Sequence, residues 1–229
     1  PTFQWYLNGD PIQDATSATY ALPTTAEFDA GDYTVVVANQ LGSATSQVAR
    51  LTLGISTVQN SSFETDVFGT FPAYVSQHFP ITGWTSLGDH GLNPAAGSPF
   101  ADNGITPNGG QVAFMQGNGI MSQLVSGFNV GSQYYLHYYE NARSVVVVPA
   151  LEVKVGGVTV VPMHMVYPVG GANPYYSMFS DVFVAENSEL LLEFNKANPQ
   201  NGDCTVLIDN VAIVEVQPET APFIGMNPT

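Results

Sequence analysis

The chain has 229 residues, of which 45% are hydrophobic, enough for one large domain or two small ones with a real core. Its 19 acidic residues outnumber its 4 Lys and Arg residues, and a surface with the resulting net charge of −15 repels phosphate backbones and anionic membranes, so we expect no nucleic-acid partner. No apolar run approaches the roughly 20 residues of a membrane-spanning helix. No signal peptide is recognisable, so we expect any secretion signal to lie upstream.

Charged residues are scarce as well as unbalanced. Because only 10% of the residues are charged, Ser, Thr, Asn, Gln and Gly supply much of the polar surface. This composition is typical of extracellular β-proteins and predicts a secreted or cell-surface location. Cys204 is the only cysteine, so no intrachain disulfide forms. We expect Cys204 to be a small buried residue.

The whole chain is predicted to be all-β. Short runs rich in Val, Tyr, Thr and Phe alternate with Gly, Pro and Asn. In the first segment, 1–54, Trp5 lies in the run FQWYL, and Asp29-Ala30-Gly31-Asp32-Tyr33 matches a D-x-G-x-Y pattern. These residues resemble strand C and the tyrosine corner of immunoglobulin-like domains. The resemblance implies a partial Ig-like β-sandwich, with strands C to G present and Trp5 and Tyr33 in its core.

The tail of the chain suggests the start of another such module. Residues 217–229, QPETAPFIGMNPT, resemble the Pro-rich linker and first strand of a following Ig-like domain. Two explanations stay open. The chain is a window cut from a longer multidomain protein, or the tail of one subunit completes the open Ig-like sheet of the next and builds a fibre.

The middle segment, 55–216, has a different character. It opens with VQNSSFE, continues with ITGWT and closes with VLIDNVAI. In this order the three motifs resemble the galactose-binding-like jelly rolls of carbohydrate-binding modules, and the resemblance implies a β-sandwich jelly roll with Trp84 in the core. Strands are expected at 111–115, 120–125 and 134–140, a hairpin at 150–160, and two further strands within 178–195.

The same resemblance implies a structural calcium ion. In such jelly rolls Ca²⁺ lies between the first and last strands, and Glu64 and Asp209 match the ligand positions of the family. Asp66 lies close to Glu64 in the sequence. Carboxylates are hard oxygen ligands that suit Ca²⁺. The alternative is that Glu64 and Asp209 cap strand ends through backbone hydrogen bonds.

A sugar site needs aromatic faces, and the strand QYYLHYYENAR offers them. With a period of two, Tyr135, His137 and Tyr139 share one face. The opposite face carries Tyr134, Leu136, Tyr138 and Glu140 and is expected to be core, which leaves Glu140 to pair with Arg143. His137 and Tyr139 are therefore candidate ligand-binding residues, with a purely structural role as the alternative.

Two long Gly- and Pro-rich segments supply further exposed aromatic candidates. The segment 66–108 contains Tyr74, and the segment 163–179 contains His164, Tyr167, Tyr175 and Tyr176. We expect them to contact a glycan or a neighbouring subunit.

Catalytic motifs are missing from the sequence. The four His residues lack metal-ligand spacing, there is no G-x-S-x-G or P-loop, and no carboxylate pair stands out. We therefore predict a non-catalytic carbohydrate-binding or adhesion segment of a large extracellular bacterial protein. The alternative is a structural repeat unit of a filament, sheath or surface layer.

Overall fold

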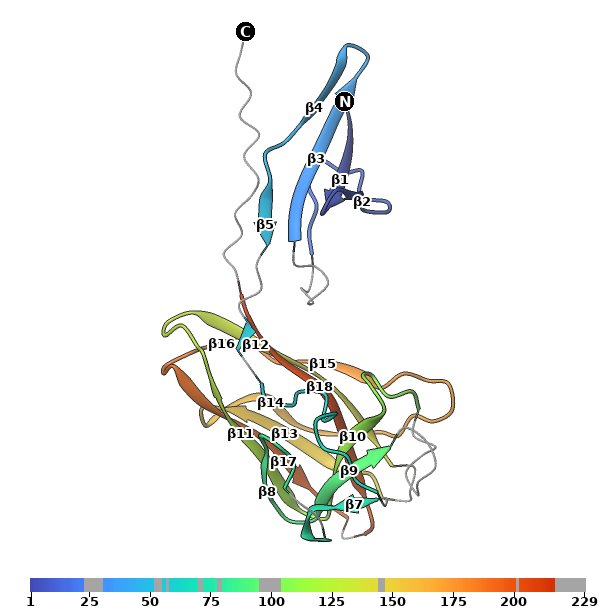
Figure 1. Ribbon diagram of the computed structural model, residues 1–229, viewed down its shortest axis with the longest axis vertical. Coiled ribbons are helices and arrows are strands. Elements are labelled where there is room, and N and C mark those ends of the chain that lie inside the picture. The colour runs from blue at the N-terminus through green and yellow to red at the C-terminus, as the bar shows by residue number, and fades with distance from the viewer. Residues whose placement is uncertain are drawn as a thin grey trace. The chain divides into compact units, whose positions relative to one another are not determined.

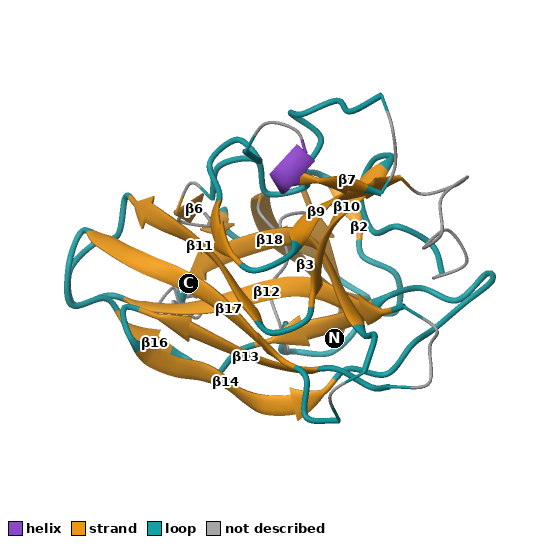
Figure 2. Ribbon diagram, turned by 90° about the horizontal axis from the view of Figure 1, so that it is seen from below, coloured by secondary structure: helices purple, strands orange, loops and turns teal. Residues whose placement is uncertain are grey.

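The computed structural model describes residues 1–22, 31–51, 55–56, 58–69, 72–77, 80–94, 104–143, 147–200 and 202–216. Within these ranges the regular structure is β-strand apart from one 3-10 turn, η2 (Val75–Gln77), as Figure 2 shows. The described part of the chain contains no helix that is long and apolar enough to cross a membrane. The chain divides into two compact units, Pro1–Gly54 and Ile55–Glu215.

The first unit contains one antiparallel sheet (Figure 1), in which β3 pairs with β1 along one edge and with β4 and β5 along the other. On one face Trp5 lies opposite Val35, and both are buried. The Tyr20 ring lies 6.0 Å from the Trp5 ring and 6.1 Å from the Tyr33 ring. The strands are β1 (Thr2–Leu7), β2 (Asp10–Pro11), β3 (Gly31–Asn39), β4 (Gly42–Thr45) and β5 (Ala49–Leu51).

The predicted burial of Trp5 and Tyr33 is confirmed, with 6% and 8% exposure. The Ig-like identity of this unit stays a prediction, because Asp29 and Ala30 of the tyrosine-corner pattern lie outside the described residues. The expected linker and strand at 217–229 also lie outside them.

The second unit is a sandwich of two antiparallel sheets. Sheet I has the order β15-β12-β18-β10-β9-β7, with β16 beside β12 and β6 beside β18, and sheet II has the order β14-β13-β17-β11-β8. Sheet I consists of β6 (Ile55–Ser56), β7 (Ala73–Tyr74), β9 (His90–Pro94), β10 (Gln111–Gln116), β12 (Gln133–Ala142), β15 (Tyr176–Phe179), β16 (Phe183–Val184) and β18 (Thr205–Glu215). Sheet II consists of β8 (Thr85–Leu87), β11 (Gly119–Ser126), β13 (Ala150–Val155), β14 (Val158–Met165) and β17 (Glu189–Ala197).

The main core lies between the two sheets, and the period-two pattern of β12 is confirmed. Tyr134, Leu136 and Tyr138 are at most 1% exposed and belong to this core. Trp84 joins it as predicted, with its ring 5.3 Å from that of Phe63. The expected strands at 111–115, 120–125 and 134–140 and the 150–160 hairpin are also present. Cys204 is buried as expected.

The outer face of sheet I carries a row of residues that crosses five strands. Tyr74 lies opposite Gly91, Gly91 opposite Phe114, Phe114 opposite Leu207, and Leu207 opposite Asn141. Because Gly91 has no side chain, the Tyr74 ring reaches the Phe114 ring edge-on, at 5.1 Å. A glycine is thus required where β7 and β9 approach each other.

Replacing this glycine is expected to destabilise the second unit. In Gly91→Ala the added Cβ overlaps the Ala73 carbonyl oxygen and lies 2.9 Å from the Phe114 ring. Overpacking of this kind typically costs about 1–3 kcal/mol. Differential scanning calorimetry should therefore show a melting temperature several degrees lower. Gly69→Ala is the matched control, because nothing lies within 4 Å of its added Cβ. Equal melting temperatures for the two variants would contradict the close approach of β7 and β9.

Candidate binding face of the second unit

A second apolar cluster covers the outer face of sheet I. Its buried members lie on β10, on β18 and directly before β15, and two tyrosines pack against them. The cluster consists of Val112, Phe114, Tyr175 and Leu207, with Tyr74 and Tyr139 half-buried against it. Sheet I is therefore apolar on both faces, and its outer face presents aromatic rings.

Four rings next to this cluster form what we call the aromatic ladder: Tyr135, His137 and Tyr139 of β12 with Phe179 of β15. The His137 ring stacks on the Phe179 ring, with centroids 4.4 Å apart and planes 16° apart. Tyr139 lies edge-on to His137 at 5.0 Å, and Tyr135 lies 6.1 Å from Phe179. Phe179 is 41% exposed, so the ladder reaches solvent.

A hydrogen bond fixes the orientation of the central ring of the ladder. The Nε2 atom of His137 lies 2.8 Å from the Ser177 hydroxyl oxygen. Burial lowers the pKa of His137, which favours the neutral imidazole at neutral pH. The ladder is therefore an uncharged aromatic surface with a hydroxyl group beside it.

Two loops close one end of this face. The Asn141 amide is held to Val169 by two hydrogen bonds, from Val169 N at 2.8 Å and to Val169 O at 3.1 Å. The Ile105 N–H donates to the Asn173 carbonyl at 2.9 Å, which joins the loop at 104–110 to the loop after β14. Tyr175, which follows the second of these loops, is buried at 6% exposure. Phe179, farther along β15, is 41% exposed.

The structure brings four of the seven predicted aromatic and histidine residues together on this face. They are Tyr74, His137, Tyr139 and Tyr175. Tyr176 is paired with Glu140 across β15 and β12, which places it on the opposite face from Phe179. Tyr167 is 58% exposed in the loop after β14.

His164 belongs to a different arrangement, which crosses from one sheet to the other. Its Nε2 atom lies 2.8 Å from Glu140 Oε1, and the Tyr138 hydroxyl donates to Glu140 Oε2 at 3.0 Å. Glu140 is 2% exposed. The hydrogen bond to Glu140 raises the pKa of His164, while the burial of the imidazole opposes this shift. The bond links β12 of sheet I to β14 of sheet II.

The expected pairing of Glu140 with Arg143 is wrong. Arg143 instead forms an ion pair with Asp203, at 2.9 Å. The reason is the alternation of β12: Glu140 points toward the core, where His164 and Tyr138 satisfy its carboxylate.

Of the three predicted calcium ligands, Glu64 and Asp209 lie at a common loop. Asn108 N–H donates to Asp209 Oδ2 at 2.9 Å, and the Gly110 and Gln111 N–H groups donate to Glu64 Oε1 at 2.9 and 2.8 Å. Such backbone hydrogen bonds are what the capping alternative predicts. Burial raises the pKa of Asp209 to about 7, and the negative charge of Glu64 adds to this shift.

Asp66 does not join this pair. Its carboxylate accepts hydrogen bonds from the Thr82 N–H at 2.8 Å, the Thr82 hydroxyl at 2.7 Å and the Asn60 side chain at 3.1 Å. Accordingly, no group of three or more His, Cys, Asp or Glu side chains suited to a metal occurs in the described part of the chain.

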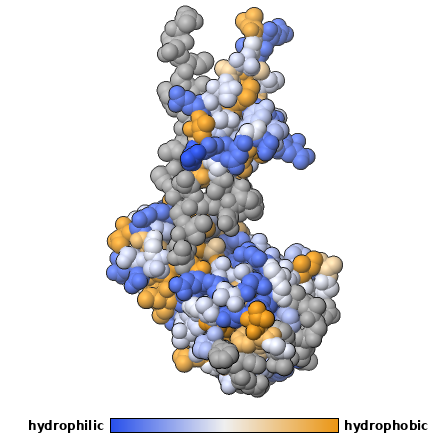
Figure 3. Space-filling model, in the orientation of Figure 1, coloured by the Kyte–Doolittle hydropathy of each residue, from blue (hydrophilic) through white to orange (hydrophobic). Residues whose placement is uncertain are grey.

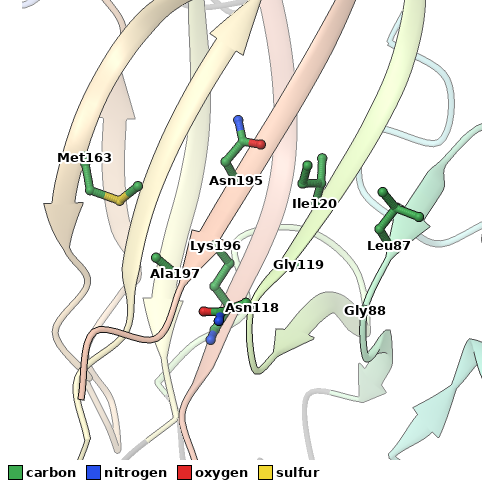
Figure 4. A pocket seen from close by; sticks show the side chains of 9 residues that line it. All are labelled: Leu87, Gly88, Asn118, Gly119, Ile120, Met163, Asn195, Lys196 and Ala197. Atoms are coloured by element: carbon green, nitrogen blue, oxygen red, sulfur yellow. The ribbon is translucent and has the colours of Figure 1, made fainter. Parts of the chain in front are cut away.

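A shallow depression of about 380 Å³ lies on sheet II between the end of β8, the start of β11 and the end of β17 (Figure 4). Lys196 is the only ionisable residue that lines it among the described residues. The Lys196 amine donates to the Gly117 carbonyl and, at 3.2 Å, to the Cys204 sulfur. Burial lowers its pKa. The depression is lined by Leu87, Gly88, Asn118, Gly119, Ile120, Met163, Asn195, Lys196 and Ala197.

Comparison with known proteins finds no matching family model. The decoration protein of Escherichia phage T5 is 53% identical to the chain over 36 residues, which is 16% of this chain and 22% of that protein. The chain therefore spans about a fifth of the length of this curated relative.

Solved structures resemble the chain more extensively. The Stig cyclase Fisc from Fischerella sp. TAU, in complex with (3Z)-3-(1-methyl-2-pyrrolidinylidene)-3H-indole, is 14% identical, with a TM-score of 0.54, over 73% of this chain and 100% of that chain. TmCBM61 in complex with β-1,4-galactotriose is 16% identical, with a TM-score of 0.44, over 70% of this chain and 99% of that chain. At such identities the cyclase shows a shared fold alone. The predicted all-β fold with a β-sandwich jelly roll is confirmed.

Two histidines are expected to affect stability with opposite dependence on pH. Because the pKa of His164 is raised on folding, its stabilising effect is full below the ordinary value of about 6.5 and is lost as pH rises through the folded-state pKa. For His137 the pKa is lowered, so its favourable effect is present above about 6.5 and is lost as pH falls through the folded-state pKa.

Melting temperatures at pH 6 and pH 8.5 test this expectation. The decrease in melting temperature caused by His164→Gln should be larger at pH 6 than at pH 8.5, by a few degrees. The reason is that a hydrogen bond between charged groups typically contributes about 1.5–3 kcal/mol. His137→Gln is the matched control and should show the reverse trend. The same trend in both variants would contradict the assigned environments.

Proposed function

We propose that the second unit binds carbohydrate, without catalysis, on the outer face of sheet I. The observation that carries the proposal is the aromatic ladder, in which stacked, uncharged rings reach solvent through Phe179. Aromatic rings pack against the apolar C–H side of a pyranose ring. The Ser177 hydroxyl next to His137 supplies a polar group for sugar hydroxyls.

The non-catalytic role is inferred from the positions of two acids, Glu140 on β12 and Asp209 on β18. Glycoside cleavage needs two carboxyl groups on either side of the scissile bond. Among the described residues, Glu140 is directed into the core, and Asp209 is buried and bonded to the backbone. Neither acid is available to a sugar on the ladder.

The segment is proposed to belong to a large secreted or surface-exposed protein, with the first unit as a spacer. The similarity to a phage decoration protein supports a second candidate, a structural unit on the surface of an assembled particle. In that case the outer face of sheet I contacts a neighbouring subunit.

Aromatic substitutions on β15 test the glycan proposal. Phe179→Ala is expected to weaken binding to a glycan that gives a signal on an array by about tenfold or more, because the most exposed ring of the ladder is lost. Tyr176→Ala is the matched control: Tyr176 is on the same strand and 44% exposed, but faces the other way. Isothermal titration with the array ligand measures both.

Binding that is lost with Tyr176→Ala and retained with Phe179→Ala would contradict the proposed face. The structural candidate would be favoured if no glycan on the array gave a binding signal and electron micrographs showed assembled particles or filaments.

We also propose that Glu64 and Asp209 hold a calcium ion. Asp209 is fully buried, and the negative charge of Glu64 disfavours its ionised form. A cation bound at this position would reduce the repulsion between the two carboxylates. Gly109 supports the fit, because a Cβ there would overlap the Glu64 carboxylate. Asp66 is not part of the proposed ligand set.

Calcium is therefore expected to stabilise the second unit. At a concentration of about 100 times its Kd, a ligand that binds only the folded state adds about 2.7 kcal/mol. Calorimetry of chelator-treated protein should show a higher melting temperature after Ca²⁺ is added. Asp209→Asn should abolish the increase, whereas Asp181→Asn, an exposed acid on another loop, should preserve it. An unchanged wild-type melting temperature would count against the site.

A further inference from the structure

A groove of about 350 Å³, lined by apolar and acidic residues, lies at the edge of the sandwich and shares no residue with the aromatic ladder. The turn of the β13–β14 hairpin forms one side, and β16 with the start of β17 forms the other. Four of its lining side chains are apolar yet exposed: Val158 by 56%, Val182 by 54%, Val184 by 51% and Leu191 by 40%. Exposed apolar residues that gather in one groove indicate an interaction surface.

Three exposed carboxylates, those of Asp181, Glu186 and Glu189, also line the groove. None of them forms an ion pair within the described part of the chain, and no Lys or Arg is among the described lining residues. The groove therefore combines an apolar surface with uncompensated negative charge.

Two edge strands flank the groove. Within the described residues β14 pairs with β13 alone and β16 pairs with β12 alone, so each has one edge without a partner strand. A backbone hydrogen bond from Asp181 N–H to the Val160 carbonyl, 3.0 Å long, joins the two sides. Unpaired strand edges favour an extended chain as the occupant.

We propose that this groove docks a short extended peptide segment of another protein, with apolar side chains flanked by Lys or Arg. The apolar residues pack on Val182, Val184 and Leu191, and the basic residues face Asp181, Glu186 and Glu189. Charge complementarity selects a basic partner over an acidic one. No residue of the aromatic ladder lines the groove, so the two proposed sites are formed by different residues.

A peptide of alternating Val and Lys is the probe, and a peptide of alternating Val and Glu is its control. Backbone amide NMR of the full chain should show shifts at β16 and at 186–191 on titration with the basic peptide alone. Glu186→Gln combined with Glu189→Gln should weaken its binding by about tenfold, and Val184→Ser should also weaken it.

The net charge of −15 requires a control for nonspecific attraction. Asp10→Asn combined with Asp14→Asn removes the same charge from exposed positions of the first unit and should leave binding unchanged. Equal weakening by the two double variants overturns the proposal, as do shifts elsewhere on the surface or equal binding of the acidic peptide.

Discussion

Burial of strand β18 on both faces is the constraint around which the second unit is built. Val206, Ile208 and Ile213 pack into the core between the sheets, while Leu207 packs into the outer cluster of sheet I. Strands covered on both faces have nearly continuous apolar sequences, as TVLIDNVAI does. The second layer supports the aromatic ladder, because Tyr139 rests on the outer cluster. A chain without intrachain disulfides and with few charges thus obtains rigidity from packing. Figure 3 shows that apolar and hydrophilic residues remain interspersed on the face it displays.

Polar residues within this double layer shape the candidate site. The register between β12 and β18 shifts between His137 and Tyr139, opposite the segment that contains Asp209 and Asn210. Asn210 has a φ of 48°, and its N–H donates to Asp209 Oδ1 at 2.7 Å. Such irregularities redirect side chains near functional sites. The irregularity therefore connects the orientation of the ladder to the acidic pair at Glu64 and Asp209.

Local patterns predicted the strands, and three-dimensional pairing decided the site. The period of two placed Tyr135, His137 and Tyr139 on one face correctly, because alternation is a property of the strand itself. Phe179 was missed, because it joins the ladder only through pairing with His137 across β15 and β12. Tyr176 was predicted to act with the other loop aromatics, but it lies on the opposite face of β15 from Phe179. A shift of one residue along a strand moves a side chain to the other face.

The error at Glu140 has the same origin. Nearness in sequence favoured Arg143, whereas the inward side of β12 faces His164 of β14, a residue of the other sheet. Cross-sheet contacts depend on how the two layers stack, and no short motif encodes that. Asp66 was likewise assigned by nearness to Glu64, while its carboxylate is engaged by Thr82.

The acidic composition has different consequences for the two proposed surfaces. The ladder carries no formal charge when His137 is neutral, so contacts with a neutral glycan depend little on salt. The groove depends on Asp181, Glu186 and Glu189, whose attraction for a basic segment weakens as the Debye length falls below about 10 Å. Ionic strength therefore separates the two interactions. A protein with both surfaces would hold a neutral glycan at high salt while it releases a basic partner.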